Sequence, residues 1–451
     1  MKIKHFFIIL LNIFIIADCL FPVEIMADNN DVLGLPDFPH ITSSSIVLMD
    51  ADSGEVLYGS NADKKSYPAS TTKLLTGLIT IENCALSDTI TFSKAAVNSI
   101  EAGDANASIS EGEQLTIEQA LYCLILRSAN EVAYGLAEHV GGTLSNFASM
   151  MNDYAQSLGC INTHFTNASG LTDQFHYTTP YDMALIAKAC FNNKSLMKIV
   201  GYSDIYTIGP TNKSNFTRYY THRYKMLPGG DYAYPYSCGG KTGYTDAAGS
   251  CLVSFAQKDD LRLICVVMNG GDESRYTDTA ALFDYYFNNY KKITLEDFDA
   301  GLSAASVDIL EIMDSLNPSG RTQLNFKEGA YLLVPDKVDK SELTGIVTYA
   351  DNEAYMGDEG GFACISYYYN NINVGKATIF ISDSSDDNLP GSSAIPPAVN
   401  NISTDKENTH FINIFYILGG IVLIALIIFI ILYFMKIRGR RHRYGSKRLR
   451  F

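Results

Sequence analysis

The sequence predicts an α+β domain with an antiparallel sheet and a helical subdomain, followed by a small all-β domain and a single transmembrane helix. Strand-like segments lie at both ends of residues 38–290, with helical patterns between them, which favours one antiparallel sheet. From about residue 293 short alternating segments replace the helical patterns. Residues 411–435 contain no charged side chain, and a segment of that length can cross a hydrocarbon core of about 30 Å.

The individual elements of residues 38–290 follow from local patterns. Residues 44–49 and 55–58 flank the turn Asp52-Ser53-Gly54 and predict a β-hairpin. Thr116 and Gln119 form a capping box that opens a helix to about Leu126. Further helices are expected for about 15 residues from 70 and at 131–141, 144–158, 180–190 and 276–289, and strands at 239–243, 251–256 and 262–269.

Charge is distributed unevenly along the 451 residues. The formal net charge of −15 argues against a nucleic-acid-binding protein, because such proteins present a basic face. Residues 436–451 nevertheless carry eight Lys and Arg and no acid, whereas residues 28–435 carry 24 bases and 47 acids. An acidic body and a basic tail on one chain indicate two compartments.

The two ends of the chain predict its topology. Residues 1–27, with a basic start and an apolar run, are typical of a secretory signal peptide. Residues 384–410 are rich in Ser, Asp, Asn and Pro and predict a stalk linker. It leads into the transmembrane helix at 411–435 and a cytoplasmic tail at 436–451, because Lys- and Arg-rich flanks stay in the cytoplasm. We therefore expect a single-pass plasma-membrane protein whose folded domains lie on the extracellular face.

Residues 294–383 predict the small β domain. Its strand-like segments contain no obvious chemical group, so a spacer or a binding module is the expected role. The segments are 330–334, 343–349, 362–369 and 373–381.

Eight cysteines follow residue 27, and they indicate neither a metal site nor a cofactor. No two are spaced as CxxC, and none has a histidine at ligand spacing. Most lie in apolar runs, where a buried thiol is as reasonable as a disulfide. Cys251 and Cys265 fall on adjacent predicted strands and could be cross-strand neighbours.

Three short motifs contain residue types that could take part in catalysis. Ser70 and Lys73 form an SxxK element at a predicted helix start, where the i, i+3 spacing places both side chains on one face. A hydroxyl is a weak nucleophile, and a desolvated lysine can serve as its base. Ser128 and Asn130 at a helix junction could relay a proton and position the lysine.

The third motif, Lys241-Thr242-Gly243, lies on a predicted strand. A lysine and a hydroxyl there suit a substrate carboxylate, and Gly243 would let a substrate backbone lie against the strand edge. Each motif alone is weak, because Ser, Thr and Lys are common residues.

The order SxxK, SxN, KTG resembles the β-lactamase and penicillin-binding-protein superfamily. The segments SIVLMDADSGEVLYGSNADKKSYPASTTKLLTGL, LILRSANEVAYGLAEHVGG, FTNASGL and GGKTGYTDAAGSCLV are similar to those of the D-alanyl-D-alanine carboxypeptidases. The resemblance covers residues 38–290 closely and 294–383 loosely. It implies the transpeptidase-like α+β fold and a serine carboxypeptidase that shortens peptidoglycan stem peptides.

The resemblance implies a role for each motif residue. Ser70 attacks the carbonyl of the penultimate D-alanine, Lys73 takes the serine proton, Ser128 passes a proton to the departing D-alanine, and Asn130 holds the cluster. The resemblance also implies that Lys241 and Thr242 grip the terminal carboxylate beside Gly243, and that the backbone N–H groups of Ser70 and Tyr244 form the oxyanion hole. β-Lactam antibiotics are expected to acylate Ser70 as inhibitors.

Other functions are compatible with all or part of this set of residues. A class A β-lactamase also needs a glutamate downstream of SxN, and no Glu occurs between Glu138 and Glu273. A D,D-endopeptidase or a transpeptidase would use the same residues, and a non-catalytic wall-binding protein would keep only the fold. His222 stands where the family usually has Asn, and we expect it at the surface or rim of the site without a catalytic role.

Overall fold

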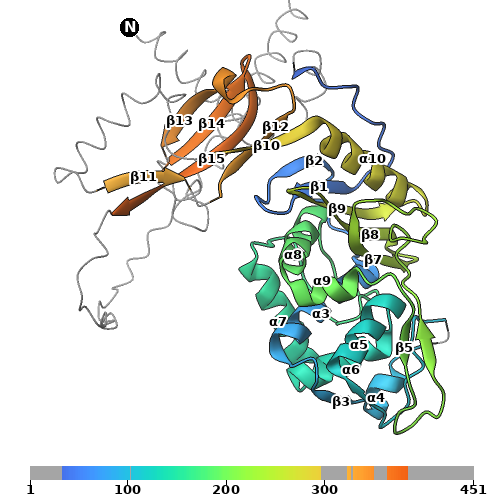
Figure 1. Ribbon diagram of the computed structural model, residues 1–451. Coiled ribbons are helices and arrows are strands. Elements are labelled where there is room, and N and C mark those ends of the chain that lie inside the picture. Colours follow the sequence, from blue (N-terminus) through green and yellow to red (C-terminus); the bar gives the residue numbers. More distant parts are fainter. Residues whose placement is uncertain (1–32, 102, 296–321, 327–328, 350–362, 384–451) are drawn as a thin grey trace, which may run out of the picture. The chain divides into compact units, whose positions relative to one another are not determined.

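The computed structural model describes residues 33–101, 103–295, 322–326, 329–349 and 363–383 (Figure 1). The expected signal peptide, stalk, transmembrane helix and basic tail lie outside these residues. Within the part that is described, no helix is both long enough and apolar enough to cross a membrane.

A five-stranded antiparallel sheet organises residues 46–270. Its strand order is β2-β1-β9-β8-β7, so the first hairpin of the chain pairs with strands more than 200 residues later. The predicted hairpin and the three later strands are confirmed. The strands are β1 (Ile46–Asp50), β2 (Val56–Ser60), β7 (Ser237–Thr245), β8 (Gly249–Lys258) and β9 (Leu261–Gly270).

Each face of this sheet carries its own core. Leu263, Cys265 and Val267 of β9 pack on one face together with the aromatic side chains of α10 (Ser274–Asn289). Ile264, Val266 and Met268 of the same strand point to the other face, which α8 (Pro180–Asn192) and the helical subdomain cover. The period of two along a strand explains why β9 is buried almost throughout.

The helical subdomain confirms the predicted helices with one difference. The capping box of Thr116 and Gln119 is formed, but the regular helix α5 ends at Tyr122 and the chain continues as a π-helix, η3 (Cys123–Arg127). The wider turn of η3 delivers Ser128 in a left-handed conformation, φ +60°. Three more predicted helices are α3 (Lys73–Asn83), α6 (Asn130–Gly141) and α7 (Leu144–Ser157). The short helices α4 (Lys94–Asn98) and α9 (Lys194–Val200) were not predicted.

Two short ribbons border the helical subdomain. One pairs β3 (Thr89–Thr91) with β4 (Gln114–Thr116), and the other pairs β5 (Tyr206–Ile208) with β6 (Arg218–Tyr220). Neither ribbon was predicted from the sequence, because three-residue strands carry too little alternation to be recognised.

The idea that Cys251 and Cys265 are cross-strand neighbours is wrong. Cys265 pairs with Ser254, whereas Cys251 pairs with Gly243 on the other side of β8. The two thiols also belong to the cores on opposite faces of the sheet, and both are free.

The predicted β segments after residue 293 are also present. β10 (Tyr290–Thr294) pairs with β12 (Tyr331–Pro335). A four-stranded antiparallel sheet has the order β11-β15-β14-β13. Its strands are β11 (Thr322–Phe326), β13 (Thr344–Tyr349), β14 (Ala363–Tyr369) and β15 (Ile372–Asp383).

Candidate active site

Ser70 lies on a sharp turn between the sheet and the helical subdomain. It belongs to the short 3-10 helix η2 (Ala69–Thr72), which leads directly into α3. The preceding residue, Ala69, has φ +48°, a left-handed conformation that is uncommon for a residue with a side chain. β7 runs closely past this turn, since a Cβ placed on Gly243 would lie 3.0 Å from the Ser70 nitrogen. Strained backbone of this kind is typical of functional sites.

Lys73 connects the first two motifs. Its Nζ donates to Ser70 Oγ at 3.0 Å, to Asn130 Oδ1 at 2.8 Å and to the Ser169 carbonyl at 2.6 Å. The side chain has no exposed surface. Burial lowers the pKa of Lys73 from its ordinary 10.5 to about 7, against the opposing charges of Glu131 and Asp104. The structure therefore places beside Ser70 an amine that can exist without its charge near neutral pH.

Ser128 and Asn130 lie on either side of the junction between η3 and α6. Asn130 is the first residue of α6, and its main-chain N–H donates to the Ala105 carbonyl at 2.8 Å. Both side chains are buried, and only the Asn130 amide contacts Lys73.

Lys241 joins the third motif to Ser128. It lies on β7 and is buried, and its Nζ donates to Ser128 Oγ at 3.0 Å and to its neighbour Thr242's carbonyl at 2.8 Å. Burial, and then the positive charge of Lys73, holds the pKa of Lys241 well below its ordinary 10.5. The two lysines thus link all three motifs, Lys73 through the Asn130 amide oxygen and Lys241 through the Ser128 hydroxyl.

The remaining residues of the third motif follow β7. Thr242 is partly buried and Gly243 is buried against η2. The Tyr244 side chain is 61% exposed, and its hydroxyl donates to Asp246 at 3.2 Å. The main-chain N–H of Tyr244 follows Gly243 directly on β7, and its role in an oxyanion hole stays a prediction.

Three residues near the site were not singled out from the sequence. The Ser169 carbonyl accepts from Lys73, and the adjacent Gly170 lies against the Ala69 carbonyl. Both belong to the FTNASGL segment, so the resemblance was the available signal. Arg275 on α10 donates to the Gly243 carbonyl at 3.5 Å, and its Nε is buried without a partner. No local pattern marks Arg275, because it reaches β7 only through the tertiary fold.

Two histidines close to the site have fixed structural hydrogen bonds. His176 Nδ1 accepts from the Thr166 main chain, so Nε2 carries the proton and donates to Thr72 Oγ1 at 3.0 Å. His222 Nδ1 accepts from the Tyr224 main chain, and its Nε2 donates to the Val200 carbonyl, both at 3.0 Å. Both ring nitrogens of His222 are engaged and the ring is partly buried, so it is a structural residue. Burial lowers the pKa of each histidine to about 4.

Within the part of the chain that the structure describes, no three His, Cys, Asp or Glu side chains come together as metal ligands would.

Gly170→Ala should destabilise the protein and reduce acylation of Ser70. A Cβ on Gly170, which has φ +83°, would lie 1.8 Å from the Ala69 carbonyl oxygen. Gly159 is the matched control, because it has φ +84° and no atom within 4 Å of its Cβ position. Gly159→Ala should cost roughly 1–2 kcal/mol in thermal or denaturant unfolding, the strain term alone. Equal losses in the two variants would show that Gly170 does not support the turn at Ser70.

His222→Asn should remove part of the acid sensitivity of the fold. An asparagine can donate to one main-chain group and accept from another, as His222 does. Because burial lowers the His222 pKa to about 4 from an ordinary 6.5, the unfolded chain binds an additional proton between these values. Stability therefore falls as pH falls from 6.5 to 4, by on the order of 3 kcal/mol for this residue.

Unfolding curves at pH 7 and pH 4 measure this effect. The exposed His40→Asn is the control and should keep the wild-type difference between the two pH values. An unchanged difference in His222→Asn would contradict the assignment.

This chain is similar to proteins of known family. A family model described as D-alanyl-D-alanine carboxypeptidase matches residues 34–272. The carboxypeptidase DacF of Bacillus subtilis is 32% identical over 255 residues, which are 55% of this chain and 63% of the relative. DacC of Escherichia coli is 29% identical and is covered to 64%, so the chain spans less than two thirds of both relatives.

Solved structures agree in fold. A D-alanyl-D-alanine carboxypeptidase from Mycobacterium tuberculosis superimposes with a TM-score of 0.51 at 28% identity, covering 56% of this chain and 94% of that one. The Streptomyces K15 DD-transpeptidase gives a TM-score of 0.52 at 27% identity, covering 56% of this chain and all of the other. The penicillin-binding, transpeptidase-like α+β fold is therefore confirmed. With more than half of its residues matched, the chain belongs to the D-alanyl-D-alanine carboxypeptidase family.

Proposed function

We propose that this protein is a serine-type D-alanyl-D-alanine carboxypeptidase that removes the terminal D-alanine from peptidoglycan stem peptides. The observation that carries the proposal is the buried Lys73 amine bonded to both Ser70 Oγ and Asn130 Oδ1. Family membership and the names of the relatives support the substrate class.

The hydrogen bonds of Lys73 suggest how it would act as the base. As an ammonium it would use all three hydrogens on its three acceptors. As a neutral amine it would keep two donors for Asn130 and Ser169 and direct its lone pair at Ser70 Oγ. A pKa of about 7 makes both forms available near neutral pH. The Ser70 proton would then move to Lys73 as Oγ attacks the peptide carbonyl.

The remaining motif residues would act on the two ends of the broken bond. Ser128 would pass a proton to the departing D-alanine amine. Lys241 and Thr242 would hold the terminal carboxylate, and Arg275 would add positive charge behind Gly243. The main-chain N–H groups of Ser70 and Tyr244 would stabilise the tetrahedral oxyanion. Water would then release the shortened peptide from Ser70.

The same machinery accounts for the expected inhibitor and for the second candidate activity. β-Lactams would acylate Ser70 because they resemble the acyl-D-alanyl-D-alanine end. Transfer of the acyl group to an amine instead of water would make the protein a transpeptidase, as the Streptomyces neighbour is named.

We further propose that the protein acts at the outer face of the plasma membrane. The apolar segment 411–435 would anchor it, with the basic residues 436–451 in the cytoplasm and 1–27 removed as a signal peptide. A peptidoglycan substrate is consistent with this location.

Ser70→Ala should abolish release of D-alanine from a pentapeptide that ends in D-Ala-D-Ala. The full-length wild type should release it, because only the wild type has the nucleophile beside Lys73. D-Alanine release can be followed by a coupled oxidase assay, with labelling by fluorescent penicillin in parallel. Penicillin labelling without D-alanine release would favour the endopeptidase or transpeptidase. A folded wild type with neither reaction would favour a wall-binding protein.

Acylation of Ser70 by penicillin should rise with pH through about 7 and then level off. Neutral Lys73 is the reactive form, and its fraction increases about tenfold per pH unit below its pKa of about 7. Stopped-flow or gel-based acylation rates between pH 5 and 9 test this. Lys73→Arg should lose the reaction, since an arginine stays charged. A flat wild-type profile would argue against Lys73 as the base.

A further inference from the structure

A turn at residues 105–107 lies directly behind the catalytic motif. The Asn130 N–H donates to the Ala105 carbonyl at 2.8 Å, and the Ala107 N–H donates to Glu131 Oε1 at 2.6 Å. The Tyr220 hydroxyl donates to the Ala107 carbonyl at 2.8 Å. The first two residues of α6 therefore hold this turn, and the first of them also contacts Lys73.

Glu131 is an unusual residue to find in this position. It has no exposed surface, and its Oε2 is buried without a hydrogen-bond partner. Burial raises its pKa, while main-chain N–H groups, led by that of Ala107, and the positive charge of Lys73 oppose this. A buried carboxylate with one unsatisfied oxygen lowers stability unless nearby charge compensates it.

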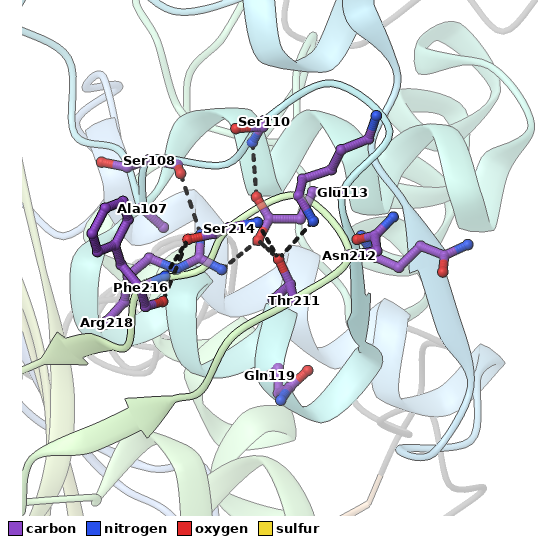
Figure 2. Close-up of polar contacts among 12 residues, drawn as sticks. Ala107, Ser108, Ser110, Glu113, Gln119, Thr211, Asn212, Ser214, Phe216 and Arg218 are labelled. Carbon is purple, nitrogen blue, oxygen red and sulfur yellow. Dashed lines mark hydrogen bonds and ion pairs between the residues drawn. The ribbon is translucent and has the colours of Figure 1, made fainter.

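A second buried glutamate, Glu113, differs from Glu131 in its hydrogen-bond partners (Figure 2). Glu113 is equally buried, but Ser110 N–H and Thr211 Oγ1 donate to its carboxylate and Arg218 forms an ion pair with it. Arg218 also donates to the Ser108 carbonyl at 3.2 Å, as Figure 2 shows. Glu113 is thus paired with a cation in direct contact, whereas Glu131 keeps one carboxylate oxygen without a partner.

We propose that Glu131 is a positioning residue for Lys73: it holds residues 105–107 behind Asn130, whose side-chain amide contacts the buried amine. This inference rests on the proposed role of Lys73 as the base for Ser70. Glu131 acts through Lys73 and Asn130, without contacting the substrate.

The charges around Lys73 determine the sign of the effect. Glu131, and after it Asp104, raises the Lys73 pKa, whereas burial and Arg223 lower it. Lys241 is the other buried cation coupled to Lys73, and His176 nearby is neutral above pH 4. Removing the Glu131 charge should therefore lower the Lys73 pKa further. The amine would be neutral at lower pH but would be a weaker base.

The test is the pH profile of penicillin acylation in the full-length Glu131→Gln variant. Glutamine keeps the length and an oxygen that can accept from Ala107. We expect the acid limb to move about one pH unit lower and the plateau rate to fall about threefold. Glu138→Gln is the matched control, because Glu138 lies on the same helix and accepts from Ser93 Oγ. Its profile should equal that of the wild type.

Glu131→Asp gives the complementary result. It retains the charge and should restore the position of the acid limb, even if the shorter side chain lowers thermal stability. An unchanged acid limb in a folded Glu131→Gln variant would overturn the proposal and leave Glu131 as a loop anchor. Failure of the proposed function would appear separately, as absence of acylation in the wild type.

Discussion

The site depends on the complete burial of the Lys73 amine. An amine removed from water must be given acceptors by the protein. Here they are Ser70 on the adjacent η2, Asn130 at the start of α6 and the Ser169 carbonyl. Their convergence brings η2, α6 and the segment at Ser169 together around one amine. The same burial lowers the pKa of the amine to about 7. The burial of Lys73 would therefore also make it available as a base near neutral pH.

Two backbone positions at the site have a left-handed conformation. Ala69 and Ser128, each beside or within a motif, have positive φ values of +48° and +60°. Such residues cost of order 1–3 kcal/mol each and persist only when the surroundings determine them. Gly170 and Gly243 leave the space that the Ala69 turn needs. The cores on both faces of the sheet, through α8 and α10, supply the stability that offsets this strain.

The sequence was sufficient for much of the fold and for the identity of the motif residues. The helices and long strands were predictable because their periodicity is local, and the pairing of Ser70 with Lys73 follows from one helical turn. The Lys241 contact with Ser128 was not predictable, since it joins residues 113 apart. The π-helix before Ser128 and the role of the Ser169 carbonyl were missed for a related reason. Main-chain geometry set by tertiary packing leaves no residue pattern of its own.

The net charge of the whole chain does not determine the local charge at this site. Residues 28–435 are strongly acidic, yet Lys73, Lys241 and Arg275 gather where the three motifs meet. Exposed charges are screened over about 8–10 Å at physiological salt, whereas buried ones are screened far less. A substrate that ends in a carboxylate would therefore respond at close range to the buried cations and only weakly to the acidic surface. In such a site a single buried carboxylate such as Glu131 would influence Lys73 more than the many acids outside.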